Sequence, residues 1–109
     1  MSVSMFYVSP QTNAQKSFNI PVCTEDVFRR VIRPAADRVG ARIVPLFEVG
    51  FELSSQDAAV VVGELLDVTK QLQADTSEEA AYALPRLIRL SEEIGEIFKM
   101  HPEAVLYIG

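Results

Sequence analysis

The chain of 109 residues is long enough for one domain with its own core, and 49% apolar with 23% charged residues is typical of an ordinary folded protein. A single cysteine excludes an internal disulfide, and a single histidine excludes most zinc ligand sets. The net charge of −5 is unevenly spread: residues 1–42 hold six basic and three acidic residues, whereas residues 43–109 hold four basic and twelve acidic residues. The acidity is therefore concentrated in one part of the chain.

The N-terminal region predicts a β-hairpin. Residues 3–9 ("VSMFYVS") and 17–23 ("SFNIPVC") are rich in β-branched and aromatic residues, and turn formers lie between them. Pro21 has no N–H to donate to a β-ladder, so it indicates an edge position or a strand end.

An amphipathic helix is expected over residues 25–39. Thr24 is a suitable N-cap, apolar residues recur at helical spacing, and Gly40 is placed to end the helix. Pro34 lies inside this segment, where it removes a backbone hydrogen bond and clashes with the preceding turn. The sequence therefore predicts a kink or a break near Arg33.

Residues 42–53 ("RIVPLFEVGFEL") predict the clearest strand. From Phe47 onward apolar side chains alternate with Glu48, Gly50 and Glu52, so one face is expected to be buried and the other solvated. This pattern is typical of an antiparallel or mixed sheet whose helices lie on one face only.

Two long helices and a closing strand are expected to complete the chain. Ser54, with Ser55 as competitor, caps a helix whose apolar stripe ends at Leu72. Thr76 and Glu79 form a capping box that opens a helix reaching about Met100, with Pro85 marking a kink or the first turn of a second segment. The His-Pro pair ends it, and residues 103–109 ("EAVLYIG") form the last strand.

These elements predict one α+β domain over residues 1–109, a two-layer sandwich of order ββαβααβ. The sheet is expected to have about four strands, antiparallel or mixed, with three helices on one face.

Tests for chemistry are mostly negative. On one strand, Glu48 and Glu52 lie about 13 Å apart, too far for a carboxylate dyad. Cys23 is expected to be buried and inert, and His101 to act as a cation at a helix C-terminus. Arginines on the first helix are expected to form a solvated face or to pair with acidic residues rather than to bind nucleic acid. No metal, phosphate or nucleophile motif occurs, so we expect no cofactor, no metal and no enzymatic activity.

The acidic helix and terminal strand "SEEIGEIFKMHPEAVLYIG", with "FEVGFELSSQD" upstream, carry a resemblance. In size, acidity and α+β layout the chain resembles the small immunity proteins of bacterial toxin and immunity pairs. The resemblance implies a stoichiometric inhibitor that occludes the active site of a basic toxin domain. The carboxylates expected to contact this partner are Glu48, Glu52, Glu64, Asp67, Glu92, Glu93 and Glu96.

Two other functions stay open. A homo-oligomer, such as a homodimer, could pair the positive first 42 residues with the negative remainder of a neighbour. A small-ligand domain could hold a pocket near Tyr7, Tyr82 or Tyr107. The N-terminal sequence has no basic region and no long apolar run, so we expect a cytoplasmic protein that does not enter a membrane.

Overall fold

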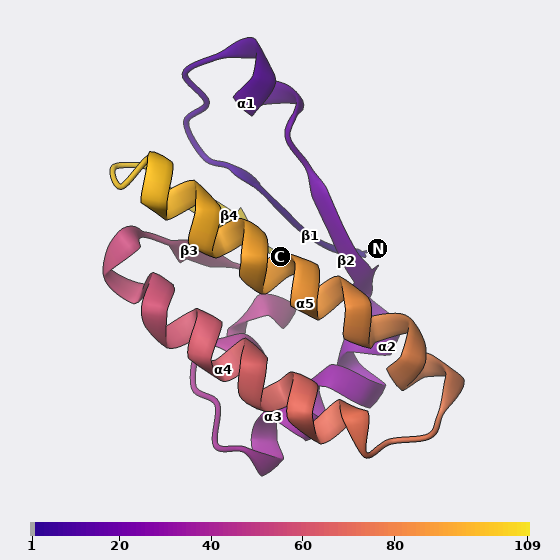
Figure 1. Ribbon diagram of the computed structural model, residues 1–109. Coiled ribbons are helices and arrows are strands. Elements are labelled where there is room, and N and C mark those ends of the chain that lie inside the picture. Colours follow the sequence, from indigo (N-terminus) through magenta and orange to yellow (C-terminus); the bar gives the residue numbers. More distant parts are fainter. Residues whose placement is uncertain (1) are drawn as a thin grey trace.

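A computed structural model describes residues 2–109 and shows an antiparallel sheet covered by helices (Figure 1). The chain order of its elements is β1 (Ser2–Tyr7), α1 (Asn13–Ser17), β2 (Ile20–Thr24), α2 (Glu25–Val27), the π-helical turn η1 (Phe28–Ile32), α3 (Arg33–Arg38), the 3₁₀ helix η2 (Val44–Glu48), β3 (Phe51–Leu53), α4 (Ser55–Gln73), α5 (Glu78–Met100) and β4 (Leu106–Ile108). The α+β class is confirmed. The predicted order is followed except for α1 and η2, which interrupt segments expected to be a loop and a strand.

The sheet has four strands in the order β2-β1-β4-β3, and all three pairings are antiparallel. The C-terminal strand β4 therefore lies in the interior of the sheet, between β1 and β3. Pro21 lies on β2, an edge strand, as its missing N–H predicted.

Helices α4 and α5 run side by side in opposite directions and form the helical layer (Figure 1). Helix α5 contacts β2, whereas α4 contacts β3 and the α3–η2 region. In the middle of the sheet, buried side chains alternate with more accessible ones, as Met5 and Ile108 do with Phe6 and Tyr107. The more accessible side chains, such as Phe6 and Tyr107, lie on the face opposite the buried ones, which we call the second face of the sheet. Among residues 2–109 no helix is both long and apolar enough to cross a membrane.

The irregularity predicted near Arg33 takes the form of a π turn. The Arg33 N–H bonds the carbonyl of Phe28, five residues back, and Pro34 follows inside the first turn of α3. The wider turn lets the chain continue as a helix to Arg38 although Pro34 cannot donate. Gly40 then adopts φ of +71°, as the predicted helix-ending glycine requires.

The long strand predicted over residues 42–53 is wrong for most of its length. Residues 44–48 form η2, and only Phe51–Leu53 pairs with β4. Pro45 suits the first turn of a helix, and the carboxylate of Glu64 accepts the N–H groups of residues 42–44. As a result Val49, predicted to be buried, is 79% exposed.

The start of α5 differs from prediction by one residue, and the start of α4 agrees with it. Helix α5 is capped by Ser77, whose hydroxyl accepts the Ala80 N–H at 3.1 Å, and not by Thr76. Asp75 accepts the Ser77 N–H at 2.8 Å and so holds the cap in place. Helix α4 begins after Ser54, as predicted, but this side chain makes no capping hydrogen bond. Helix α5 continues through Pro85 to Met100 without a second start.

Candidate functional site

The structure divides the seven carboxylates predicted to contact a partner into engaged and available groups. Glu48 and Glu64 bond other parts of this chain. Glu52 lies on the sheet, and Asp67 lies exposed on α4. Glu92, Glu93 and Glu96, which we call the acidic segment, lie within five residues of one another on α5.

Glu48 is neutralised by the arginines of the first helical region. Arg33 Nη1 donates to Glu48 Oε1 at 3.1 Å, and Arg29 Nε lies 3.8 Å from the second oxygen. The Glu48 side chain is only 25% exposed. Its charge is therefore used within the fold, and Glu48 is not a freely displayed carboxylate.

The other prominent arginine of this region is also paired within the chain. Arg30 forms ion pairs with Asp26, one turn earlier, and with Glu79 at the start of α5. The hydrogen bond that the Arg30 guanidinium donates to the Asp26 carboxylate raises the pKa of Arg30. The interpretation that these arginines pair with acidic residues is supported by these contacts. This pairing also neutralises part of the positive charge that an oligomer was expected to offer a neighbour.

Glu64 caps η2 from a distance. Its Oε1 accepts the N–H groups of Ile43 and Val44, both at 2.9 Å, and its Oε2 accepts the Arg42 N–H at 3.1 Å. These donors lie at the start of a short helix, where backbone N–H groups lack partners within the helix. A structural role therefore accounts for Glu64, which the sequence pattern placed on the polar side of α4.

Glu52 belongs to a cross-strand row on the second face of the sheet. Tyr107 pairs with Glu52 on one side and with Phe6 on the other, and the Phe6 and Tyr107 ring centroids are 5.2 Å apart. Gly50, at φ of +103°, leaves room for the Tyr107 phenol, because a Cβ on Gly50 would lie 1.9 Å from its oxygen. The row combines one carboxylate with an aromatic pair, so it is not an acidic patch.

The acidic segment is the group that the fold leaves available. Glu92 and Glu96 are exposed, and within residues 2–109 no ion pair engages any of the three carboxylates. They occupy the C-terminal half of α5, where negative charge opposes the helix dipole. This effect is strong only in the last turn, so what distinguishes the segment is three neighbouring carboxylates without an ion pair among residues 2–109.

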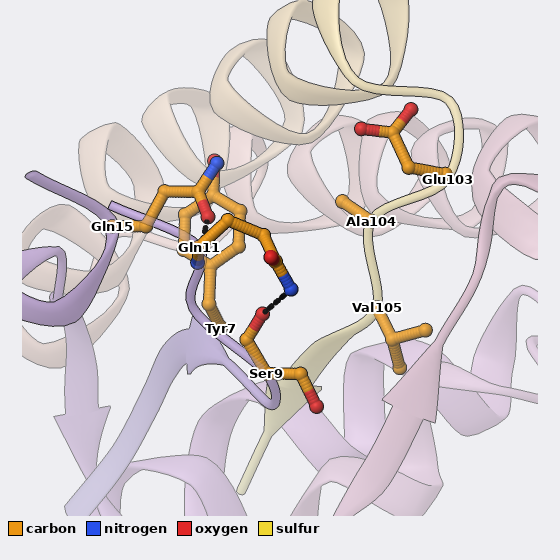
Figure 2. A pocket seen from close by; sticks show the side chains of 7 residues that line it. All are labelled: Tyr7, Ser9, Gln11, Gln15, Glu103, Ala104 and Val105. Atoms are coloured by element: carbon orange, nitrogen blue, oxygen red, sulfur yellow. Dashed lines mark hydrogen bonds between the residues drawn. The ribbon is translucent and has the colours of Figure 1, made fainter.

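A small cavity lies between the arm that follows β1 and the segment that leads into β4 (Figure 2). It has a volume of about 150 Å³. Its more apolar walls are formed by Tyr7, Ala104 and Val105. Its polar lining is formed by Ser9, Gln11, Gln15 and Glu103.

The cavity is linked electrostatically to the acidic segment. The pKa of Tyr7 is raised, first because the phenol is partly desolvated and second because of the negative charge of Glu93. The Tyr7 ring is also fixed by an edge-on contact with Phe18, with centroids 5.3 Å apart. The Tyr7 phenol on the cavity wall therefore lies close enough to Glu93 to be affected by its charge.

A second, more open hollow of about 350 Å³ lies where α5 begins. It is lined by Thr24, Val27, Glu78, Glu79 and Tyr82. The Arg86 guanidinium lies 3.7 Å from the centroid of the Tyr82 ring, so one face of that ring already holds a cation. Glu79 is likewise held by Arg30. This hollow is therefore less available to a basic partner than the cavity at Tyr7.

The surroundings of Cys23 and His101 are explained by their places in the fold. Cys23 is buried, and burial raises the pKa of its thiol to about 11, which opposes the thiolate that a nucleophile requires. His101 ends α5 and its Nδ1 lies 3.8 Å from Glu103 Oε1. No group of three or more potential metal ligands gathers in the part of the chain that the structure describes.

Sequence reasoning did not find the capping role of Glu64 or the cavity, although it named Tyr7 and Tyr82 as possible pocket residues. Both hollows are lined by one of these tyrosines. Comparison of the chain with protein-family models, curated proteins and solved structures gives no significant match. The class defined by the fold is an α+β domain whose antiparallel sheet has one helix-covered face.

Proposed function

We propose that this chain is a non-catalytic, protein-binding inhibitor of the immunity-protein kind, which neutralises a basic toxin enzyme in the bacterial cytoplasm through an acidic surface. The supporting observation is the acidic segment, Glu92, Glu93 and Glu96. Its three carboxylates lie close together on α5 and make no ion pair within residues 2–109. Three neighbouring carboxylates without an internal partner concentrate negative charge that a cationic partner can pair with.

The mechanism follows from charge. An enzyme that acts on a polyanion presents lysines and arginines in its active site, and carboxylates can take the place of the substrate's phosphates. Complementary charge raises association rates above the neutral range of about 10⁵–10⁶ M⁻¹s⁻¹, and the gain falls as salt rises. Occlusion of the active site then needs no catalytic residue on the inhibitor.

The partner can be identified by affinity capture from the native host at low and moderate salt. The expected result is one basic protein in near one-to-one amount, with less recovered as salt rises. Recovery of the bait alone at both salt concentrations would contradict the proposal.

The acidic segment is tested by the triple variant E92Q/E93Q/E96Q. We expect slower association with the captured partner and a flatter salt dependence, while the free energy of unfolding changes by less than about 1 kcal/mol. A matched control, E25Q/D57N/E78Q, removes the same charge from the first turns of α2, α4 and α5, away from the acidic segment. Equal effects of both variants on association would show that total charge, and not this segment, attracts the partner.

Self-association is a second candidate, favoured by the aromatic row on the second face of the sheet. Phe6 is 37% exposed and lies beside Tyr107, so two copies could bury these rings face to face. Sedimentation analysis of the wild-type chain and of F6S over a range of concentrations tests it. A single-chain mass for the wild type at every concentration would remove this candidate.

A further inference from the structure

The cavity in Figure 2 has an apolar interior and a charged rim. Ala104 lies on one side and Tyr7 on the other, so a short hydrocarbon chain can be received between them, while the Val105 side chain points away from Tyr7. Glu103 comes from the same segment as Ala104, and its side chain is 77% exposed. Its carboxylate therefore reaches solvent beside the cavity.

The other polar groups of the lining are already partly engaged. Gln15 Oε1 accepts the Gln11 N–H at 2.7 Å, and Gln11 Nε2 donates to the Ser9 carbonyl at 3.2 Å (Figure 2). These hydrogen bonds fix the conformation of the segment that follows β1. Glu103 is then the charged residue of the cavity lining. No lysine or arginine is among the residues that line this cavity. An anionic ligand would therefore meet repulsion without a compensating cation.

We propose that this cavity receives a lysine or arginine side chain of the protein partner, with its aliphatic stem between Tyr7 and Ala104 and its charged end at Glu103. This inference rests on the proposed function and names a feature that the partner's surface must have. Long basic side chains bury an apolar stem while keeping their charge near water. The volume of about 150 Å³ equals that of an engineered protein cavity that holds a benzene molecule, so a four-carbon stem fits.

The charges around the site favour this occupant over a neutral one. Glu103 attracts the cationic end directly, and Glu93, whose charge acts on the Tyr7 phenol, adds negative potential from α5. A neutral apolar group would fill the same space but gain nothing from either carboxylate. Charge on the ligand should therefore change its affinity, and this difference can be measured without knowing the partner.

The test uses n-butylammonium and n-butylguanidinium as probes, followed by amide chemical shifts of the full chain. Saturable shifts are expected at Ser9, Gln11 and Val105, with affinity at least about threefold higher than for 1-butanol, which has the same stem without charge. Butyrate, with the opposite charge, should bind more weakly than 1-butanol. Equal affinity for the cation and the alcohol, or cation-induced shifts confined to Glu92 and Glu96, would overturn the proposal.

Two variants at the cavity and one control variant locate the effect. E103Q should weaken binding of n-butylammonium about two- to fivefold and leave 1-butanol unchanged, because the pair is partly exposed. A104L, which fills the cavity, should weaken both probes, and E78Q at the second hollow should change neither. An E103Q variant that binds the cation as tightly as the wild type refutes the assigned role of Glu103.

Failure of this inference is distinguishable from failure of the proposed function. The small-molecule titration decides whether the cavity accepts a basic side chain. The affinity capture decides whether the chain has a basic protein partner. If a basic partner is captured but the cavity binds the cationic probe no better than 1-butanol, the proposed function is retained and the cavity is not part of the interface.

Discussion

Replacing Glu64 by alanine should destabilise the fold although the side chain lies on the polar side of α4. The carboxylate accepts three backbone N–H groups, from residues 42, 43 and 44, at 2.9 to 3.1 Å. Alanine leaves these donors to water or to no partner. The 3₁₀ helix η2 then loses the contact that ties its start to α4.

The magnitude follows from the kind and number of bonds. A hydrogen bond to a charged group contributes about 1.5–3 kcal/mol when it is well buried, and less when water can replace it. Three bonds at a partly exposed site therefore sum to about 2–3 kcal/mol, reduced by a few tenths because alanine favours the helix. Glutamine keeps Oε1 for Ile43 and Val44 but presents an amide group to the Arg42 N–H, so about 1 kcal/mol is expected for E64Q.

Urea unfolding measures the effect. With an m-value of about 1.5 kcal/mol/M, E64A should lower the midpoint by about 1.5 M, and E64Q by about half as much. D67A is the matched control, since Asp67 is exposed on the same helix and makes no side-chain hydrogen bond with residues 2–109. Equal midpoints for E64A and D67A would refute the capping role.

Two further predictions concern glycine and cysteine. Gly50→Ala should lower the free energy of unfolding by about 2–4 kcal/mol, because φ is +103° and the new Cβ would meet Tyr107. Gly63→Ala, at an open position on α4, should instead raise it by about 0.5–1 kcal/mol. Similar effects of the two variants in thermal or urea unfolding would contradict this assignment. The pKa of Cys23 in the folded state is raised to about 11 from an ordinary value of 9.0, so above pH 9 the unfolded state loses its proton first. The free energy of unfolding should therefore fall by about 2–3 kcal/mol as the pH rises toward 11. This pH dependence should be smaller in Cys23→Ala, and an identical dependence in both proteins would refute the shift.

Much of the fold could be predicted because its longest elements carry strong local signals. Helices α4 and α5 show apolar stripes at helical spacing, and these stripes are the buried sides in the structure. Gly40 and Pro21 are also local signals. Glycine readily adopts the left-handed conformation at a helix end, and proline lacks the N–H that an interior strand would donate. Such features require no knowledge of distant parts of the chain.

The segment before β3 could not be predicted because a distant residue decides its structure. Alternation of apolar and polar residues over 42–53 fits a strand, and the capping carboxylate lies about twenty residues further along. Local preference in so short a segment is weak compared with three hydrogen bonds to a carboxylate. The cavity is equally non-local, because its two walls come from the beginning and the end of the chain.

The same distinction governs the candidate site. Sequence pattern can place a carboxylate on the polar side of an element, but it cannot tell whether an arginine or a row of N–H groups lies opposite. Glu48 and Glu64 have such partners, and the acidic segment of α5 has none within residues 2–109. Neutralising the first two should therefore lower stability, while neutralising the acidic segment should lower association with a basic partner at nearly constant stability. This separation is what a binding surface requires and what a merely solvated helix face does not produce.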